Sequence, residues 1–121
     1  MKKLTIQEEE VMQAIWAIGS GVIKDFISKL DQSDKIPYTT VASIVRNLEK
    51  KGYVESKRYG NTNVFTPKIH LSDYKREFMG TVVKDYFTNS YKDMVAFFVK
   101  EKRLSKDELE EIIELIESNN E

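Results

Sequence analysis

The sequence predicts a mainly α-helical protein interrupted by one small β-hairpin. Two observations support this fold class. Apolar residues recur at helical spacing before residue 52 and after residue 71. Between these segments, residues 53–67 contain two short alternating stretches joined through a Gly-Asn pair, as in a hairpin. The 121 residues are 40% hydrophobic and 32% charged, which suits one domain, or two small ones, with a buried core.

The first two predicted helices lie between residues 4 and 30. Thr5 and Glu8 have the spacing of a capping box, which predicts that the first helix begins there. Apolar residues follow at i, i+3, i+4 and i+7, and the glycine-rich residues 19–21 end the helix. Residues 22–30 repeat the apolar spacing and predict the second helix. The polar residues 31–37 predict a loop.

The third predicted helix runs from about Tyr38 to Lys51, with Gly52 in the position of a C-terminal cap. At 100° per residue it has two contrasting faces. The face expected to point inward comprises Val41, Ile44, Val45 and Leu48. The face expected to point outward comprises Thr39, Thr40, Ser43, Arg46, Asn47 and Lys50.

The outward face has the chemistry of a helix that reads DNA in the major groove. Short side chains let a helix sit deep in the groove, and hydroxyl groups can reach base edges or phosphates. Arg46 suits a guanine edge or a phosphate, and Lys50 suits a phosphate. A solvated helix face is also commonly polar and basic, so a surface that binds another protein is the alternative.

The predicted hairpin comprises residues 53–58 and 62–67, and Pro67 ends its second strand. Lys57, Arg58 and Tyr59 lie near its tip, where they suit a wing that grips phosphates. Three helices followed by such a hairpin predict a winged helix-turn-helix over residues 1–70. The expected partner is double-stranded DNA.

The second half of the chain predicts three more helices over residues 71–121. Ser72 is the expected N-cap of a helix that runs to about Phe87, and a short helix begins near Tyr91. Ser105 and Glu108 form a second capping box before the last helix. This half carries more apolar groups than three short helices can bury, so a symmetric dimer interface is expected. The interface prediction comprises Phe78, Val82, Tyr86, Phe87, Phe97, Phe98, Ile112 and Ile116. Packing against the winged helix in a compact monomer is the alternative.

The charge is divided unevenly between these halves. Residues 1–68 hold 11 Lys and Arg against 8 Asp and Glu, a balance of +3. Residues 69–121 hold 8 against 12, a balance of −4. The overall charge of −1 argues against a nucleic-acid partner, whereas the local distribution permits one.

Several classes of function are excluded or disfavoured. Without cysteine the chain forms no disulfide and no thiolate metal site. The single histidine, His70, has no matching cluster, so we expect no metal site, no cofactor and no enzymatic activity. No apolar run approaches the length of a membrane span, and the N-terminus lacks the apolar segment of a signal peptide. We therefore expect a cytoplasmic protein that does not bind membranes directly.

The sequence resembles the penicillinase-repressor family (BlaI/MecI/CopY) over nearly its whole length. The resemblance rests on "LTIQEEEVMQAIWAIG" at the N-terminus and "YTTVASIVRNLEKKGYV" in the third helix and wing entry. "YKREFMGTVVKDYF" and "MVAFFVKEKRLSKDELEEIIELIE" are similar to its C-terminal helices. The resemblance implies a homodimeric transcriptional repressor that binds a palindromic operator. It also implies release by a membrane-embedded sensor metalloprotease, which cleaves within the penultimate helix and lowers dimer stability.

The sequence departs from this family pattern at two places. The β-lactam-responsive members carry an Asn-Phe scissile pair where this chain has Phe97-Phe98, so only the second residue matches. Phe97-Phe98 is the candidate cleavage site, either uncut or cut by a protease of different preference. The copper-responsive members carry cysteine pairs near the C-terminus, and this chain has none, which excludes copper sensing of that kind.

Overall fold

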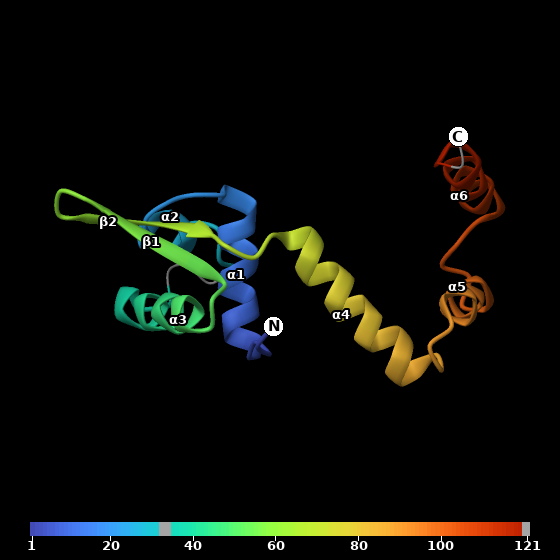
Figure 1. Ribbon diagram of the computed structural model, residues 1–121, viewed down its shortest axis with the longest axis horizontal. Coiled ribbons are helices and arrows are strands. Elements are labelled where there is room, and N and C mark those ends of the chain that lie inside the picture. The colour runs from blue at the N-terminus through green and yellow to red at the C-terminus, as the bar shows by residue number, and fades with distance from the viewer. Residues whose placement is uncertain (32–34, 120–121) are drawn as a thin grey trace. The chain divides into compact units, whose positions relative to one another are not determined.

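The computed structural model describes residues 1–31 and 35–119, and the chain divides into two compact units (Figure 1). The first unit is Met1–Tyr74, and the second begins at Lys75. The sequence placed its boundary between residues 70 and 71, four residues earlier. Along the chain the elements are α1 (Ile6–Ile18), α2 (Ile23–Ile27), α3 (Tyr38–Lys50), β1 (Val54–Tyr59), β2 (Thr62–Pro67), α4 (Leu71–Tyr86), α5 (Tyr91–Lys100) and α6 (Lys106–Asn119).

The first unit packs α1, α2 and α3 against the base of the β1–β2 hairpin. The fully buried side chains come from all of these elements, so the helices and the hairpin share one core. The largest of them are Tyr53, Phe26, Met12, Ile15, Leu48, Val41, Val45 and Val54. Burial of these side chains is the main force that holds α3 against the rest of the unit.

Helix α1 has the termini that the sequence predicts. The backbone amide of Glu8 donates to Thr5 Oγ1 at 3.1 Å, and the amide of Thr5 donates to Glu8 Oε1 at 2.8 Å. The capping box is therefore confirmed. At the other end Gly19 has a φ of 95°, which an L side chain rarely adopts.

Helix α2 is shorter than predicted. The apolar spacing predicted a helix over residues 22–30, but α2 ends at Ile27. Beyond it the amides of Lys29 and Leu30 donate to carbonyls three residues back, at 3.0 Å each, so the chain tightens into turns. The predicted loop over residues 31–37 falls partly on residues 32–34, which lie outside the described residues.

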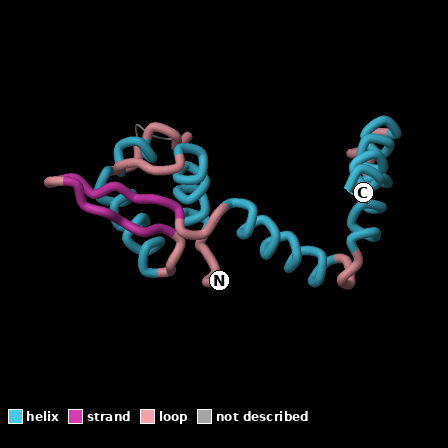
Figure 2. The backbone as a smooth tube through the Cα atoms, turned by 45° about the horizontal axis from the view of Figure 1, so that its top comes forward, coloured by secondary structure: helices cyan, strands magenta, loops and turns pink. Residues whose placement is uncertain are grey.

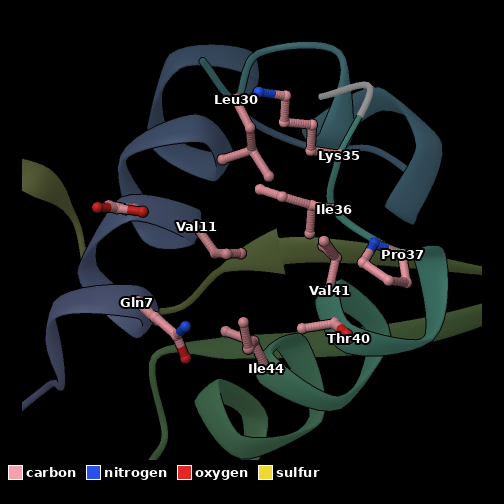
Figure 3. Close-up of a pocket in the computed structure, with 10 residues that line it drawn as sticks. Gln7, Val11, Leu30, Lys35, Ile36, Pro37, Thr40, Val41 and Ile44 are labelled. Atoms are coloured by element: carbon pink, nitrogen blue, oxygen red, sulfur yellow. The ribbon is translucent and has the colours of Figure 1, made fainter. Parts of the chain in front are cut away.

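Helix α3 buries most of the predicted inward face. Val41, Val45 and Leu48 are fully buried. Ile44 was expected beside them but is only half-buried, because it lines an open pocket of about 180 Å³ between α1, α3, Leu30 and residues 35–37 (Figure 3). Gly52, with a φ of 84°, follows the helix where a terminating glycine was predicted.

The hairpin extends beyond the helices of its unit in both views (Figures 1 and 2). Tyr59 pairs with Thr62, which leaves a two-residue turn at Gly60 and Asn61. The base of the hairpin is attached to the helices by Gly21 and Phe65, whose backbone groups exchange hydrogen bonds of 3.0 and 2.8 Å. The sequence indicated Gly21 only as part of a helix end, and this long-range bridge was missed.

The second unit continues α4 and adds α5 and α6. The prediction that Ser72 caps α4 was wrong, because the helix already begins at Leu71 and the His70 carbonyl accepts from the amide of Tyr74 at 3.1 Å. The break before α5 is confirmed by left-handed residues at 88 and 89. The second capping box is also confirmed, since Ser105 and Glu108 exchange hydrogen bonds of 3.0 and 3.1 Å.

Candidate nucleic-acid interface

The outward face of α3 is exposed along its whole length. Pro37 precedes the helix in an extended conformation, and its carbonyl accepts from the amides of Thr40 and Val41. Because Val41, Val45 and Leu48 fix the inward face, the six predicted DNA-contacting residues of α3 all lie on the solvent side. They are Thr39, Thr40, Ser43, Arg46, Asn47 and Lys50.

The two cations on this face have no partner elsewhere in the part of the chain that the structure describes. Neither Arg46 nor Lys50 forms a side-chain hydrogen bond or ion pair with a described residue. Both side chains are exposed. Their charges are therefore available to an anionic ligand, at no cost from breaking an internal ion pair.

The hairpin divides the three predicted wing residues between its two faces. Lys57 lies opposite Val64 and Arg58 lies opposite Asn63. Successive side chains of a strand point to opposite faces, so Lys57 and Tyr59 share one face and Arg58 lies on the other.

The face that carries Arg58 is the one nearer to α3. Ser56 shares that face, and its hydroxyl donates to the Glu49 carboxylate of α3. The Arg58 Nε donates to the Gly60 carbonyl at 2.9 Å, which folds the guanidinium back over the turn. On the other face Lys57 Nζ lies 5.9 Å from the centre of the Tyr59 ring. The hairpin thus brings Arg58 to the side of α3, and does not place Lys57 and Tyr59 with it.

Lys51 has a structural role that the sequence did not reveal. Its ammonium donates to Glu8 Oε1 at 2.6 Å and to the Lys3 carbonyl at 2.9 Å, so it joins the end of α3 to the start of α1. Adjacent Lys50 and Lys51 look equivalent in the sequence, yet only Lys50 remains on the exposed face. No local pattern indicates the pairing, because 43 positions separate Glu8 from Lys51.

The second unit leaves most of its apolar side chains uncovered. Among its described residues only Val83 is buried. Of the predicted interface residues, Val82 and Phe87 are half-buried and the other six are exposed, from 37% for Phe98 to 78% for Tyr86. Phe97 contacts both Phe87 and Phe98, with ring centres 5.7 and 5.5 Å apart. The helices therefore form a continuous aromatic group that is open to solvent.

Residues 4–118 match the family model of the penicillinase repressor. The chain belongs to the penicillinase repressor family. The match includes α3, the hairpin and nearly all of the three C-terminal helices, so most of each unit lies within the family region.

Curated relatives in this family align along most of their length. The chain is 27% identical to the penicillinase repressor of Bacillus licheniformis over 93% of its own length and 88% of that protein. It is 25% identical to the methicillin resistance regulatory protein MecI of Staphylococcus aureus, over 91% of its own length and 89% of that protein. These relatives are regulators, in agreement with the expectation that the chain is not an enzyme.

Solved structures identify the fold of the first unit. The DNA-binding domain of the repressor BlaI is 32% identical, with a TM-score of 0.51, and the match covers 61% of this chain and 94% of that domain. The Bacillus licheniformis BlaI monomeric form in complex with the blaP half-operator is 30% identical, with a TM-score of 0.50. The predicted fold class, a winged helix with further helices after it, is confirmed.

The described residues provide neither a cluster that could hold a metal ion nor a helix that could span a membrane. Within residues 1–31 and 35–119, no three His, Cys, Asp or Glu side chains come together in a way that could hold a metal ion. His70 is exposed, and its carbonyl accepts the hydrogen bond from the Tyr74 amide at the start of α4. No helix in those same ranges combines the length and apolarity required to cross a bilayer.

Proposed function

We propose that the protein is a homodimeric transcriptional repressor that binds a palindromic operator. Helix α3 enters the major groove, and the hairpin contacts the adjacent backbone as a wing. The observation that carries this proposal is the outward face of α3, where hydroxyl, amide and cationic side chains are exposed and Arg46 and Lys50 have no partner among the described residues. The similarity to BlaI, whose monomeric form was solved in complex with the blaP half-operator, supports the proposal that this chain binds an operator.

The proposed contacts differ in what they recognise. Four residues of α3 read base edges or position the helix in the major groove, and Asn47 and Lys50 support them. These four are Thr39, Thr40, Ser43 and Arg46. Arg58 holds a phosphate from the α3 side of the hairpin, whereas Lys57 and Tyr59 contact the backbone from the far face of the tip. The overall charge of −1 does not oppose this assignment, because the acidic excess lies after residue 68.

Dimerisation is the second part of the proposal. Each protomer places one α3 in one half-site, and the exposed apolar groups of α4, α5 and α6 are buried against the partner. Two linked reading units bind a palindrome far more tightly than one unit binds a half-site, because the second contact forms at high effective concentration.

Release of the operator follows cleavage by a membrane-embedded sensor metalloprotease, with Phe97-Phe98 as the candidate bond. The bond lies inside α5, and both rings are exposed. Intact-mass analysis of the protein from derepressed cells would detect a fragment of residues 1–97. A wholly intact chain in those cells would remove cleavage from the proposal.

The test is binding of the purified chain to labelled DNA from its own upstream region, measured by fluorescence anisotropy. A scrambled duplex of equal length is the control, and the salt concentration is varied. We expect tighter binding to the upstream DNA and a steep fall in affinity with salt, since each neutralised phosphate contributes about −0.9 to the slope of log K against log salt. Equal, salt-insensitive binding to both duplexes would instead indicate a winged-helix module that binds a protein.

A further inference from the structure

The segment between β2 and α4 is fastened to the first unit. The backbone amides of Lys68 and Ile69 both donate to the Tyr53 carbonyl, at 2.7 and 3.2 Å. The indole Nε1 of Trp16 in α1 donates to the Ile69 carbonyl at 2.9 Å. A flexible linker would leave these groups to water. Here the connection is bound on both sides, by α1 and by the residue that precedes β1.

The first turn of α4 is held by the same aromatic residues. The Tyr74 ring packs against Trp16, with ring centres 5.1 Å apart, and meets the buried Tyr53 ring nearly edge-on at 6.1 Å. The Tyr74 hydroxyl donates to Glu9 Oε2 in α1 at 3.1 Å. Burial, followed by the Glu9 carboxylate, raises the pKa of Tyr74 to about 12. The hydroxyl therefore keeps its proton throughout the physiological range and remains a donor.

This aromatic joint, defined as Trp16, Tyr53 and Tyr74 with Glu9, lies where the two units meet in sequence. The first unit ends at Tyr74, and α4 continues as one helix to Tyr86. The first residue of the proposed dimer interface, Phe78, follows Tyr74 by about one helical turn. The joint thus anchors the helix that leads directly into the dimer interface.

We propose that Trp16 and Tyr74 are positioning residues that make the repressor selective for the spacing between operator half-sites. This inference rests on the proposed function, because it requires a dimer that places two α3 helices on one duplex. One base pair more or less shifts a half-site by about 3.4 Å and rotates it by about 35°. A dimer whose reading units are attached through a fastened joint tolerates such a change poorly, whereas a loosened joint accommodates it.

The experiment uses full-length protein and palindromic duplexes in which the half-site spacing is changed by one and two base pairs in each direction. A duplex with a single half-site is included. Trp16→Phe keeps a ring but removes the bond to the Ile69 carbonyl, and Tyr74→Ala removes the ring. Ser20→Ala is the matched control, because it removes an exposed hydrogen bond to Thr66 in the same unit and changes no residue of the joint.

The wild type and Ser20→Ala are expected to prefer one spacing over its neighbours by about tenfold or more. Trp16→Phe and Tyr74→Ala are expected to reduce that ratio to about threefold or less, with single half-site affinity unchanged within about twofold. If Tyr74→Ala lacks a cooperative thermal transition, Trp16→Phe alone decides the result. Destabilisation without a role in spacing would weaken the half-site and the palindromes together.

Two results would overturn the inference and leave the repressor proposal intact. One is a wild type that binds every spacing equally while preferring palindromes to scrambled DNA. The other is a spacing profile that stays unchanged in both joint variants. If the wild type showed no preference for any half-site, the proposed function itself would fail, and the role of the joint in spacing would fail with it.

Discussion

At the scale of single residues, the buried carboxylate of Glu8 connects the pH of the solution to the stability of the fold. Burial on its own raises the pKa of this group. The hydrogen bond from Lys51 and those from Thr5 favour the charged form and outweigh burial, so the pKa of Glu8 lies below its ordinary value. A lowered pKa in the folded state contributes stability above the unfolded pKa of about 4.3, and that contribution is lost as the pH falls through the folded pKa.

Glu8→Gln should therefore lower the free energy of unfolding by about 1–3 kcal/mol at pH 7, because Lys51 and the α1 cap lose a charged acceptor. The difference from wild type should shrink as the pH falls below about 4. Urea titrations followed by Trp16 fluorescence at several pH values would measure it, with the exposed Glu10→Gln as the control. A difference that persisted unchanged to acid pH would contradict the role of the charge.

Truncation of Arg46 and truncation of Lys57 are expected to change DNA binding in different ways. Arg46→Ala should cost about 1–3 kcal/mol of operator affinity and relax the preference at one base pair, because a base-edge contact carries sequence information. Lys57→Ala should weaken binding to all duplexes alike and reduce the salt slope by about one. Anisotropy titrations on singly substituted operators would separate the two effects. Lys106→Ala, on α6, is the control, and matching profiles for all three variants would contradict this assignment of the surface.

At the scale of elements, the sequence predicted those features that depend on neighbours within one turn. The capping boxes at Thr5 and Ser105 follow from local spacing and agree with the structure. The two faces of α3 follow from it too, and they agree except at Ile44, which is only half-buried. The candidate DNA-facing residues of α3 could be predicted for the same reason. Its assignment to DNA contact stays a prediction, since spacing shows which side chains are exposed and leaves open what they bind.

Two local predictions were wrong, because residues 28–30 tighten into turns and α4 begins before Ser72. The other features that the sequence missed depend on contacts between distant positions. The pairing of Lys51 with Glu8 and the attachment of Ile69 by Trp16 join positions 43 and 53 residues apart. Alternation along the strand separates Lys57 from Arg58, but only the hydrogen bond from Ser56 to Glu49 shows that the face of Arg58 is the one toward α3.

Gly80 lies within α4, and replacing it by alanine would add one methyl group to this helix. Among the described residues, a Cβ atom at Gly80 would meet only the Tyr91 hydroxyl, at 4.0 Å, which is an ordinary contact. Gly80→Ala should therefore raise the free energy of unfolding by about 0.4–1 kcal/mol, because it reduces the freedom of the unfolded chain. Thermal and urea unfolding would measure this gain, and sedimentation would measure dimerisation. Weaker dimerisation of the variant would mean that a partner helix packs closely against Gly80.

At the scale of the whole molecule, the two units differ in how far they bury their apolar side chains. The first unit has a continuous core from α1 to β2. The described part of the second buries only Val83, while Phe78, Tyr86 and Ile116 are 49%, 78% and 57% exposed. Apolar groups gathered in this way characterise an association surface, and the proposed symmetric dimer would cover them with a second copy of the same helices.

A charge placed on this surface should separate dimerisation from DNA contact. Ile112→Asp puts a carboxylate on the apolar face of α6, where burial against a partner would be costly. We expect the wild type to be a dimer and Ile112→Asp to be a monomer when sedimentation is measured across roughly a hundredfold range of concentration. Asn119→Asp adds the same charge at the exposed end of α6 and should remain dimeric.

Ile112→Asp and Asn119→Asp should also differ in their preference for a palindromic operator over a single half-site. Ile112→Asp should lose most of the preference for a palindrome over a single half-site, because its two reading units are no longer linked. Its affinity for the single half-site should stay at the wild-type value, since α3 and the hairpin lie in the other unit. Circular dichroism would establish that the helices persist. A dimeric Ile112→Asp with undiminished preference for the palindrome would show that the protomers associate through a different surface.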